Sequence, residues 1–169
     1  MKRFTLFLLP ILFVSLAACG PDASTSDSAD EQAHQANPIA YGEDYDDYCD
    51  KLITDKRYGA LLITSDGSRH TFSSAECMIG YELEQELTEE DIEQRWVVDV
   101  VRNKRLLDVK EARFLHSKNQ PSPGGLDLSA FVDDDGLSYN MRFLLHGDDL
   151  NWTEAVELVR SSWFTPSES

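Results

Sequence analysis

Two cysteines, Cys49 and Cys77, enclose a strand–turn–strand–helix pattern and constrain the fold more than any other feature of the chain. An aliphatic run over residues 58–64 and a short run over residues 69–72 flank an Asp-Gly pair. Short strand-like runs around Asp-Gly predict a β-hairpin. A helix is expected next, so one cysteine precedes the hairpin and the other follows it.

The start of this helix is indicated by its capping pattern. Ser73 followed three residues later by Glu76 matches a capping box with Ser73 at the N-cap. Apolar residues at every fourth position predict the buried stripe: Ala75, Ile79 and Leu83. Cys77 would then lie in the first turn, where the helix dipole lowers the pKa of a thiol and favours the thiolate.

The rest of the chain repeats strand and helix patterns. Residues 88–94 are expected to extend the first helix or to begin another turn, and an amphipathic pattern over residues 151–163 predicts a last helix. Strand-like patterns are found at residues 96–101, 106–109, 111–116, 128–132 and 137–145. The predicted fold class is α+β, with two related small strand-strand-helix-strand type units forming one compact domain.

The N-terminus has the pattern of a lipoprotein leader. Residues 1–18 read as a signal peptide, with a basic start and an apolar core too short for a comfortable transmembrane helix. Leu16-Ala17-Ala18-Cys19 resembles a bacterial lipobox, which predicts lipid attachment at Cys19 and a cell-envelope protein facing the periplasm. Gly20 favours the outer membrane. Residues 19–40 are predicted to be the lipidated tether, and residues 41–166 the folded domain.

Composition and motifs exclude several functions. The chain has 31 acidic and 15 basic residues, a formal net charge of −16, which argues against nucleic acid as a partner. Residues 41–48 are acidic and aromatic but lack EF-hand spacing, so they are expected to be a solvated approach to the first strand. No nucleotide-binding, zinc-protease, Cys-x-x-Cys or nucleophile-elbow motif is present, so no enzymatic activity is expected.

The two cysteines allow three interpretations. Cys49 and Cys77 with the thioether of Met78 form the soft ligand set that suits Cu(I). A structural disulfide between the two cysteines is the alternative, because exported domains often pair their cysteines. Two inert buried thiols are the third possibility. Four further residues are potential ligands without diagnostic spacing: His70, His116, Met141 and His146.

Several short motifs follow one another along the chain. The first are Asp47-Tyr48-Cys49, Asp55-x-Arg57-Tyr58-Gly59-Ala60, Gly67, Phe72 and Glu76-Cys77-Met78-x-x-Tyr81. The later ones are Val97-Val98-Asp99-Val100, Ala112, Phe114-Leu115-x-Ser117, Ser122-Pro123-x-Gly125, Leu128-x-Ala130-Phe131 and Trp152-x-x-Ala155. Together they span about residues 44–160 and resemble the NosL family, lipoproteins associated with nitrous-oxide reductase maturation.

The resemblance implies a periplasmic Cu(I) metallochaperone without catalysis of its own. Its fold would be two related α+β units, and copper would pass to nitrous-oxide reductase or its assembly proteins. Two family methionines are replaced here, by Lys51 shortly after the first cysteine and by Gly124 in the family's Ser-Pro-Met-Gly. An ammonium beside a metal cation is unfavourable. The other function class left open is a metal-free envelope lipoprotein that binds a protein partner.

Overall fold

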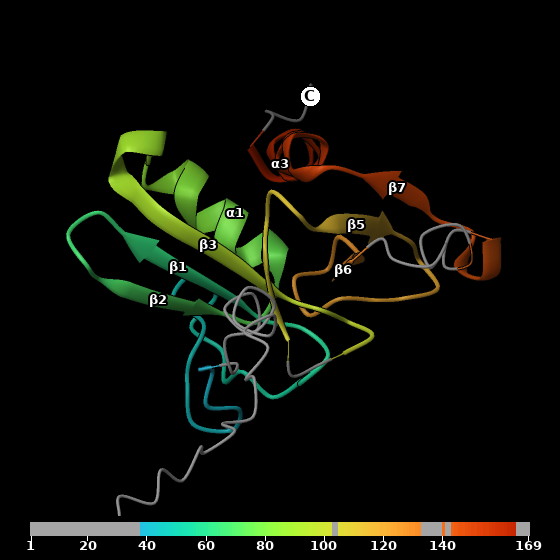
Figure 1. Ribbon diagram of the computed structural model, residues 1–169, viewed down its shortest axis with the longest axis horizontal. Helices are drawn as coiled ribbons and strands as arrows, with labels where there is room; N and C mark the ends of the chain where they lie inside the picture. Colours follow the sequence, from blue (N-terminus) through green and yellow to red (C-terminus); the bar gives the residue numbers. More distant parts are fainter. Residues whose placement is uncertain (1–37, 103–104, 133–139, 141–142, 165–169) are drawn as a thin grey trace, which may run out of the picture.

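The computed structural model describes residues 38–102, 105–132, 140 and 143–164, and this part of the chain forms two antiparallel sheets with helices packed against them (Figure 1). The predicted α+β class is confirmed. The four-stranded sheet has the order β2-β1-β3-β4, with β1 Ala60–Thr64, β2 Arg69–Phe72, β3 Ile92–Val98 and β4 Leu106–Asp108. The three-stranded sheet has the order β6-β5-β7, with β5 Arg113–His116, β6 Leu128–Phe131 and β7 Asp148–Leu150.

The predicted hairpin of residues 58–72 is confirmed as β1 and β2. The two strands pair antiparallel, with Ala60 opposite Phe72 and Ile63 opposite Arg69. Gly67 sits in the turn with a φ of +83°, a left-handed conformation that glycine adopts without a steric penalty. Its N–H donates to the carbonyl of Thr64 at 2.8 Å. Local turn chemistry therefore sets this register, as the Asp-Gly pair predicts.

The predicted first helix is confirmed as α1, Ala75–Glu84, but its cap differs by one residue. Ser74, not Ser73, is the N-cap, and its hydroxyl accepts the N–H of Cys77. Ser73 is engaged elsewhere, because both its N–H and its hydroxyl donate to Asp46. Glu76 does not close a capping box either, since its carboxylate faces Ser122 and Leu128. Tertiary partners thus overrode the local capping pattern.

One expected element is confirmed in its second form, and another is wrong. Residues 88–94 begin a new turn rather than extend α1, because Thr88 and Asp91 form their own capping box around the 3-10 turn η1, Glu89–Asp91, and β3 begins at Ile92. Residues 143–145 are helical rather than part of a strand over 137–145, most of which lies outside the described residues. The edge of the second sheet is instead β7, whose two aspartates gave no strand signal.

Helix α1 lies between the two sheets and joins them. It contacts β1, β2 and β6, and it packs against α3, Trp152–Val159, which continues into the π-helical turn η2, Arg160–Phe164 (Figure 1). One buried cluster takes residues from both sheets and both helices, including Phe72, Met78, Phe114, Leu128 and Val159. The core is therefore continuous across the two predicted units.

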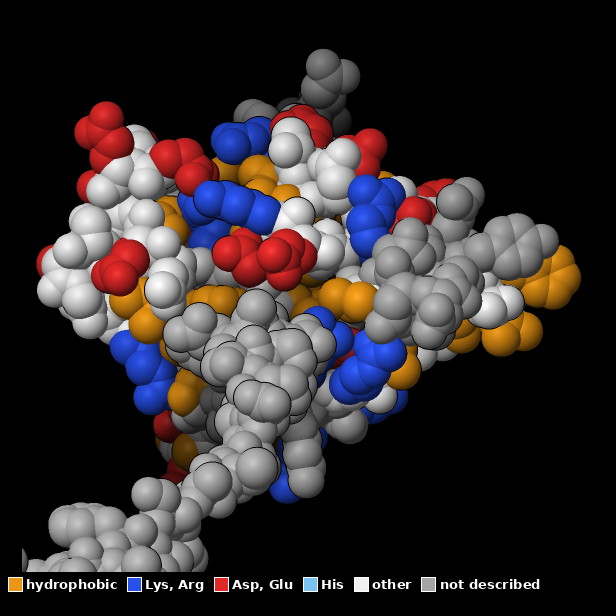
Figure 2. Space-filling view, in the orientation of Figure 1, with side chains coloured by type: hydrophobic (Ala, Val, Ile, Leu, Met, Phe, Trp, Pro, Cys, Tyr) orange, Lys and Arg blue, Asp and Glu red, His pale blue; other side chains and the backbone are white. Residues whose placement is uncertain are grey.

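The surface mixes charges of both signs. On the face shown in Figure 2, basic side chains alternate with acidic ones, and apolar side chains gather at the end of the molecule near β7. Phe143 and Leu144, in the helical residues before β7, are 68% and 70% exposed. Within the described residues, no helix combines the length and the apolar character needed to cross a bilayer. Cys19 and the predicted boundary at residue 18 lie outside this part of the chain, which begins two residues before the predicted boundary at residue 40.

Candidate metal site at the two cysteines

The fold brings Cys49 and Cys77 together. Cys49 lies in a loop that is closed by a β-bridge between Tyr45 and Leu52 and by a hydrogen bond of 2.8 Å from the N–H of Asp46 to the carbonyl of Lys51. Cys77 lies in the first turn of α1, where it is fully buried, whereas Cys49 is half-buried. The two Sγ atoms are 3.2 Å apart.

Both cysteines are free thiols in this structure. Their separation of 3.2 Å is longer than a disulfide bond, which measures about 2.05 Å, and shorter than an ordinary van der Waals contact of two sulfurs. An ion held linearly between two thiolates would need the sulfurs to move apart, because metal–sulfur bonds are about 2.3 Å long. The pair is therefore placed for chemistry that joins the two sulfurs, by a metal or by oxidation.

Asp46 is the third member of the site, and sequence reasoning missed it. Its carboxylate and the two cysteine sulfurs form a group whose ligand atoms all lie within 4.8 Å of one another, the one such group of three or more His, Cys, Asp or Glu in the described residues. Asp46 is 1% exposed and departs from the expected solvated stretch of residues 41–48, whose other members are exposed or half-buried. The signal was local: an aspartate whose side chain accepts backbone N–H groups two and three residues later is a recurrent turn motif.

The predicted thiolate at Cys77 is wrong. Burial raises the pKa of the Cys77 thiol well above its usual value, and the charge of Asp46 raises it further. The hydroxyls of Ser74 and Ser73, which lie 3.4 Å and 3.6 Å from the sulfur, act in the opposite direction. Desolvation of a thiolate outweighs the helix dipole at this depth. The metal-free site therefore holds a protonated Cys77.

Met78 lies in the main hydrophobic core and is fully buried. Adjacent helix positions point about 100° apart, so Met78 and Cys77 leave α1 in different directions. Its role as a ligand stays a prediction. His70 is engaged by Asp47, at 3.2 Å, and by the ring of Tyr81, at 4.9 Å between centroids. His116 and His146 are outside the cysteine group, and Met141 is outside the described residues.

The position of Gly124 adjoins the site. A Cβ on Gly124 would lie 2.5 Å from the hydroxyl of Ser74, the N-cap of α1, and 2.9 Å from the Cβ of Glu76, which directly precedes Cys77. The loop that carries it is tied to α1, because Ser122 donates to Glu76. The family methionine at this point of the resemblance would therefore stand beside the start of α1. Lys51, at the other replaced position, is exposed.

Two aromatic rings cover α1 next to Cys49. Tyr48 and Trp163, from η2, stack with centroids 5.8 Å apart and planes 13° from parallel. They reach the helix because residue 80 is glycine: a Cβ there would lie 2.8 Å from atoms of both rings. Burial is the largest cause of a raised pKa at Tyr48. The C-terminal turn thus packs onto the residue that precedes the half-buried cysteine.

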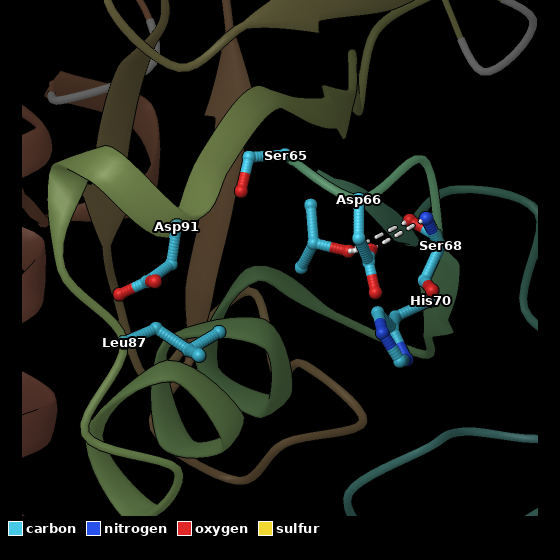
Figure 3. A pocket seen from close by; sticks show the side chains of 7 residues that line it. Ser65, Asp66, Ser68, His70, Leu87 and Asp91 are labelled. Atoms are coloured by element: carbon cyan, nitrogen blue, oxygen red, sulfur yellow. Dashed lines mark hydrogen bonds between the residues drawn. The ribbon is translucent and has the colours of Figure 1, made fainter.

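A second hollow, between the β1–β2 turn and the end of α1, is lined by two carboxylates that make hydrogen bonds within turns (Figure 3). The carboxylate of Asp66 accepts the hydroxyl of Thr64 at 2.6 Å and the N–H of Ser68 at 2.9 Å. Asp91 points away from Asp66 in this view, and its carboxylate accepts both the N–H and the hydroxyl of Thr88. These carboxylates serve turns, so the cysteine group is the stronger candidate.

No protein-family model matches the chain, and no curated protein matches its sequence. Among solved structures, the chain is similar to the copper chaperone NosL from Shewanella denitrificans, with a TM-score of 0.57 and 17% sequence identity. The superposition covers 72% of this chain and 95% of that one. The fold is NosL-like. This agrees with the fold that the motif resemblance implies, and identity this low shows the fold alone.

Proposed function

We propose that this protein is a divergent NosL-family metallochaperone that binds Cu(I) through the thiols of Cys49 and Cys77. One observation carries the proposal: a half-buried and a buried thiol stand 3.2 Å apart on a NosL-like fold. Two soft sulfur donors suit Cu(I) better than harder cations. A carrier also needs an exit for its cargo, and Cys49 is the less buried of the two cysteines.

The wider context of the proposal comes from the N-terminal pattern and the motif resemblance. We infer a lipid anchor at Cys19 in the outer membrane, a periplasm-facing domain, and delivery to nitrous-oxide reductase or its assembly proteins. The thioether of Met78, next to Cys77 in the sequence, is proposed to assist as a further soft donor.

The test is a Cu(I) titration of the reduced full chain, in detergent, against a competing Cu(I) chelator. A Cys19→Ser background leaves Cys49 and Cys77 as the only cysteines. We expect one Cu(I) per chain, lost in Cys49→Ser and in Cys77→Ser. Met78→Leu conserves volume and removes the thioether, so it measures the contribution of Met78 to the Cu(I) affinity. Unchanged binding in both cysteine variants would exclude the site.

The metal-free alternative makes a different prediction in the same experiment. A structural disulfide would leave no reactive thiol in the protein as purified, so the protein would carry no Cu(I) until it is reduced. The close approach of the two sulfurs favours this alternative as well, because oxidation needs them to move together by only about 1.2 Å.

A further inference from the structure

The carboxylate of Asp46 lies within 4.8 Å of both cysteine sulfurs, and Asp46 itself is buried. A carboxylate oxygen is an acceptable ligand for zinc, so a Cys, Cys and Asp group would ordinarily suit Zn²⁺ as well as Cu(I). Discrimination between the two ions therefore depends on whether Asp46 can donate an electron pair to a metal. This question rests on the function proposed above.

The hydrogen bonds of Asp46 use its acceptor capacity. Its Oδ1 accepts the N–H groups of Tyr48 and Cys49, both at 2.9 Å. Its Oδ2 accepts the N–H of Ser73 at 2.8 Å and the hydroxyl of Ser73 at 2.5 Å. A carboxylate offers about four lone-pair positions, and four donors meet this one. An ion at the sulfurs would have to displace a donor before Asp46 could bind it.

The same bonds place the two sulfurs. Oδ1 holds the backbone of Cys49 directly. Oδ2 holds Ser73, which is four residues before Cys77 and whose hydroxyl lies 3.6 Å from the Cys77 sulfur. Asp46 therefore binds the loop of Cys49 through Oδ1 and the segment just before α1, which carries Cys77, through Oδ2.

We propose that Asp46 is a positioning residue that also sets metal specificity: saturated by its four donors, it holds Cys49 and Cys77 together while withholding a third ligand. The site then offers an ion two sulfurs and no carboxylate oxygen. Cu(I) is bound well by soft sulfur donors alone, whereas Zn²⁺ prefers four ligands in a tetrahedron. Ser73 is the residue that keeps the carboxylate occupied.

The variant that isolates this effect is Ser73→Ala in the Cys19→Ser full chain. It removes one donor from Oδ2 and keeps Asp46, Cys49 and Cys77. We expect Zn²⁺ to bind at least about 10-fold more tightly than to the parent, with Cu(I) affinity changed by less than about 3-fold. Competition with a chelator for each ion measures both. Ser73→Gly removes the same hydroxyl and replaces Ser73→Ala if circular dichroism shows the alanine variant unfolded.

Ser74→Ala is the matched control. Ser74 is also a buried serine beside the Cys77 sulfur, but it makes no hydrogen bond to Asp46. Its loss weakens the cap of α1 and should leave the ratio of Zn²⁺ to Cu(I) affinity unchanged. A general loosening of the site would instead change this ratio equally in both serine variants.

The decisive experiment measures the Zn²⁺ affinity of the double variant Ser73→Ala/Asp46→Asn. If the freed carboxylate is what binds zinc, the double variant loses the gain in Zn²⁺ affinity, and a purely structural role of Asp46 would not produce this reversal. A Zn²⁺ affinity that stays at the parent value in Ser73→Ala, or a gain that persists without the carboxylate, overturns the proposal. The zinc comparison needs no copper. Absence of Cu(I) binding in the parent would therefore contradict the proposed function alone.

Discussion

The carboxylate of Glu76, on α1, accepts the backbone N–H of Leu128, on β6, at 3.0 Å and across 52 positions of sequence. It also accepts the hydroxyl of Ser122, so one buried side chain ties the helix of the first sheet to the second sheet. Its other oxygen, Oε2, has no hydrogen-bond partner in the described part of the chain. Burial raises the pKa of Glu76, as expected for a carboxyl removed from water.

Glu76→Ala should therefore destabilise the protein more than Glu76→Gln. The alanine leaves the Leu128 N–H unpaired and opens a cavity, at a cost of about 3 kcal/mol in the free energy of unfolding. The glutamine keeps a carbonyl oxygen for both donors and carries no charge, so it should cost less than about 1 kcal/mol. Urea denaturation followed by circular dichroism measures the difference. Equal losses would show that the two hydrogen bonds do not hold the sheets together.

Glu82 should make stability depend on pH. Burial raises the pKa of Glu82 to about 7 from 4.5, against the opposing effect of Arg95, whose Nε lies 3.1 Å from both carboxylate oxygens. Between pH 4.5 and about pH 7, Glu82 is protonated in the folded state and ionised in the unfolded state. Stability from this group is therefore complete below pH 4.5 and is lost as pH rises through 7, by about 3 kcal/mol.

The measurement is the free energy of unfolding of Glu82→Gln and of its parent from pH 4.5 to 8, which checks the direction of the pH dependence. The glutamine cannot ionise, so its curve should lack the decline that Glu82 contributes. Glu84→Gln, at an exposed position of the same helix, is the control and should follow the parent. A Glu82→Gln curve parallel to the parent would contradict the assignment.

Gly80→Ala should disturb the aromatic cover beside Cys49. Alanine ordinarily stabilises a helix relative to glycine by about 0.5–1 kcal/mol. Here its Cβ would lie 2.8 Å from the rings of both Tyr48 and Trp163, and overpacking of this kind costs about 1–3 kcal/mol. We expect a net loss of stability and a weaker near-UV circular dichroism signal from the stacked rings. A stabilised variant with an unchanged spectrum would show that the rings move aside freely.

The two thiols should differ in reactivity. Cys49 is half-buried, while Cys77 is fully buried and its pKa is raised by that burial. Because the thiolate is the reactive form, an alkylating reagent should modify Cys49 at least about 10-fold faster than Cys77. Mass spectrometry of peptides from the reduced Cys19→Ser chain, sampled over time, gives both rates. Denaturation in urea should abolish the difference, and equal rates in the folded protein would contradict the burial of Cys77.

Local patterns predicted most of the first half of the fold. The Asp-Gly turn and the stripe of Ala75 and Ile79 sufficed for the hairpin and for α1, because turn conformation and helical periodicity are short-range properties. They failed where a distant partner decided the structure. β7 is a strand because Asp148 and Leu150 find partners on β5, and Asp149 pairs with Arg113. No pattern within residues 148–150 indicates this.

The sequence by itself determined the presence of two cysteines in one small α+β domain and the resemblance that makes copper the leading interpretation. Only the tertiary structure decided their chemistry. It brought the sulfurs to 3.2 Å, buried Cys77 so that its thiol stays protonated, and surrounded Asp46 with donors from the loop and from Ser73. The physical reason is that desolvation and hydrogen-bond saturation depend on groups far apart in sequence, which no local spacing encodes.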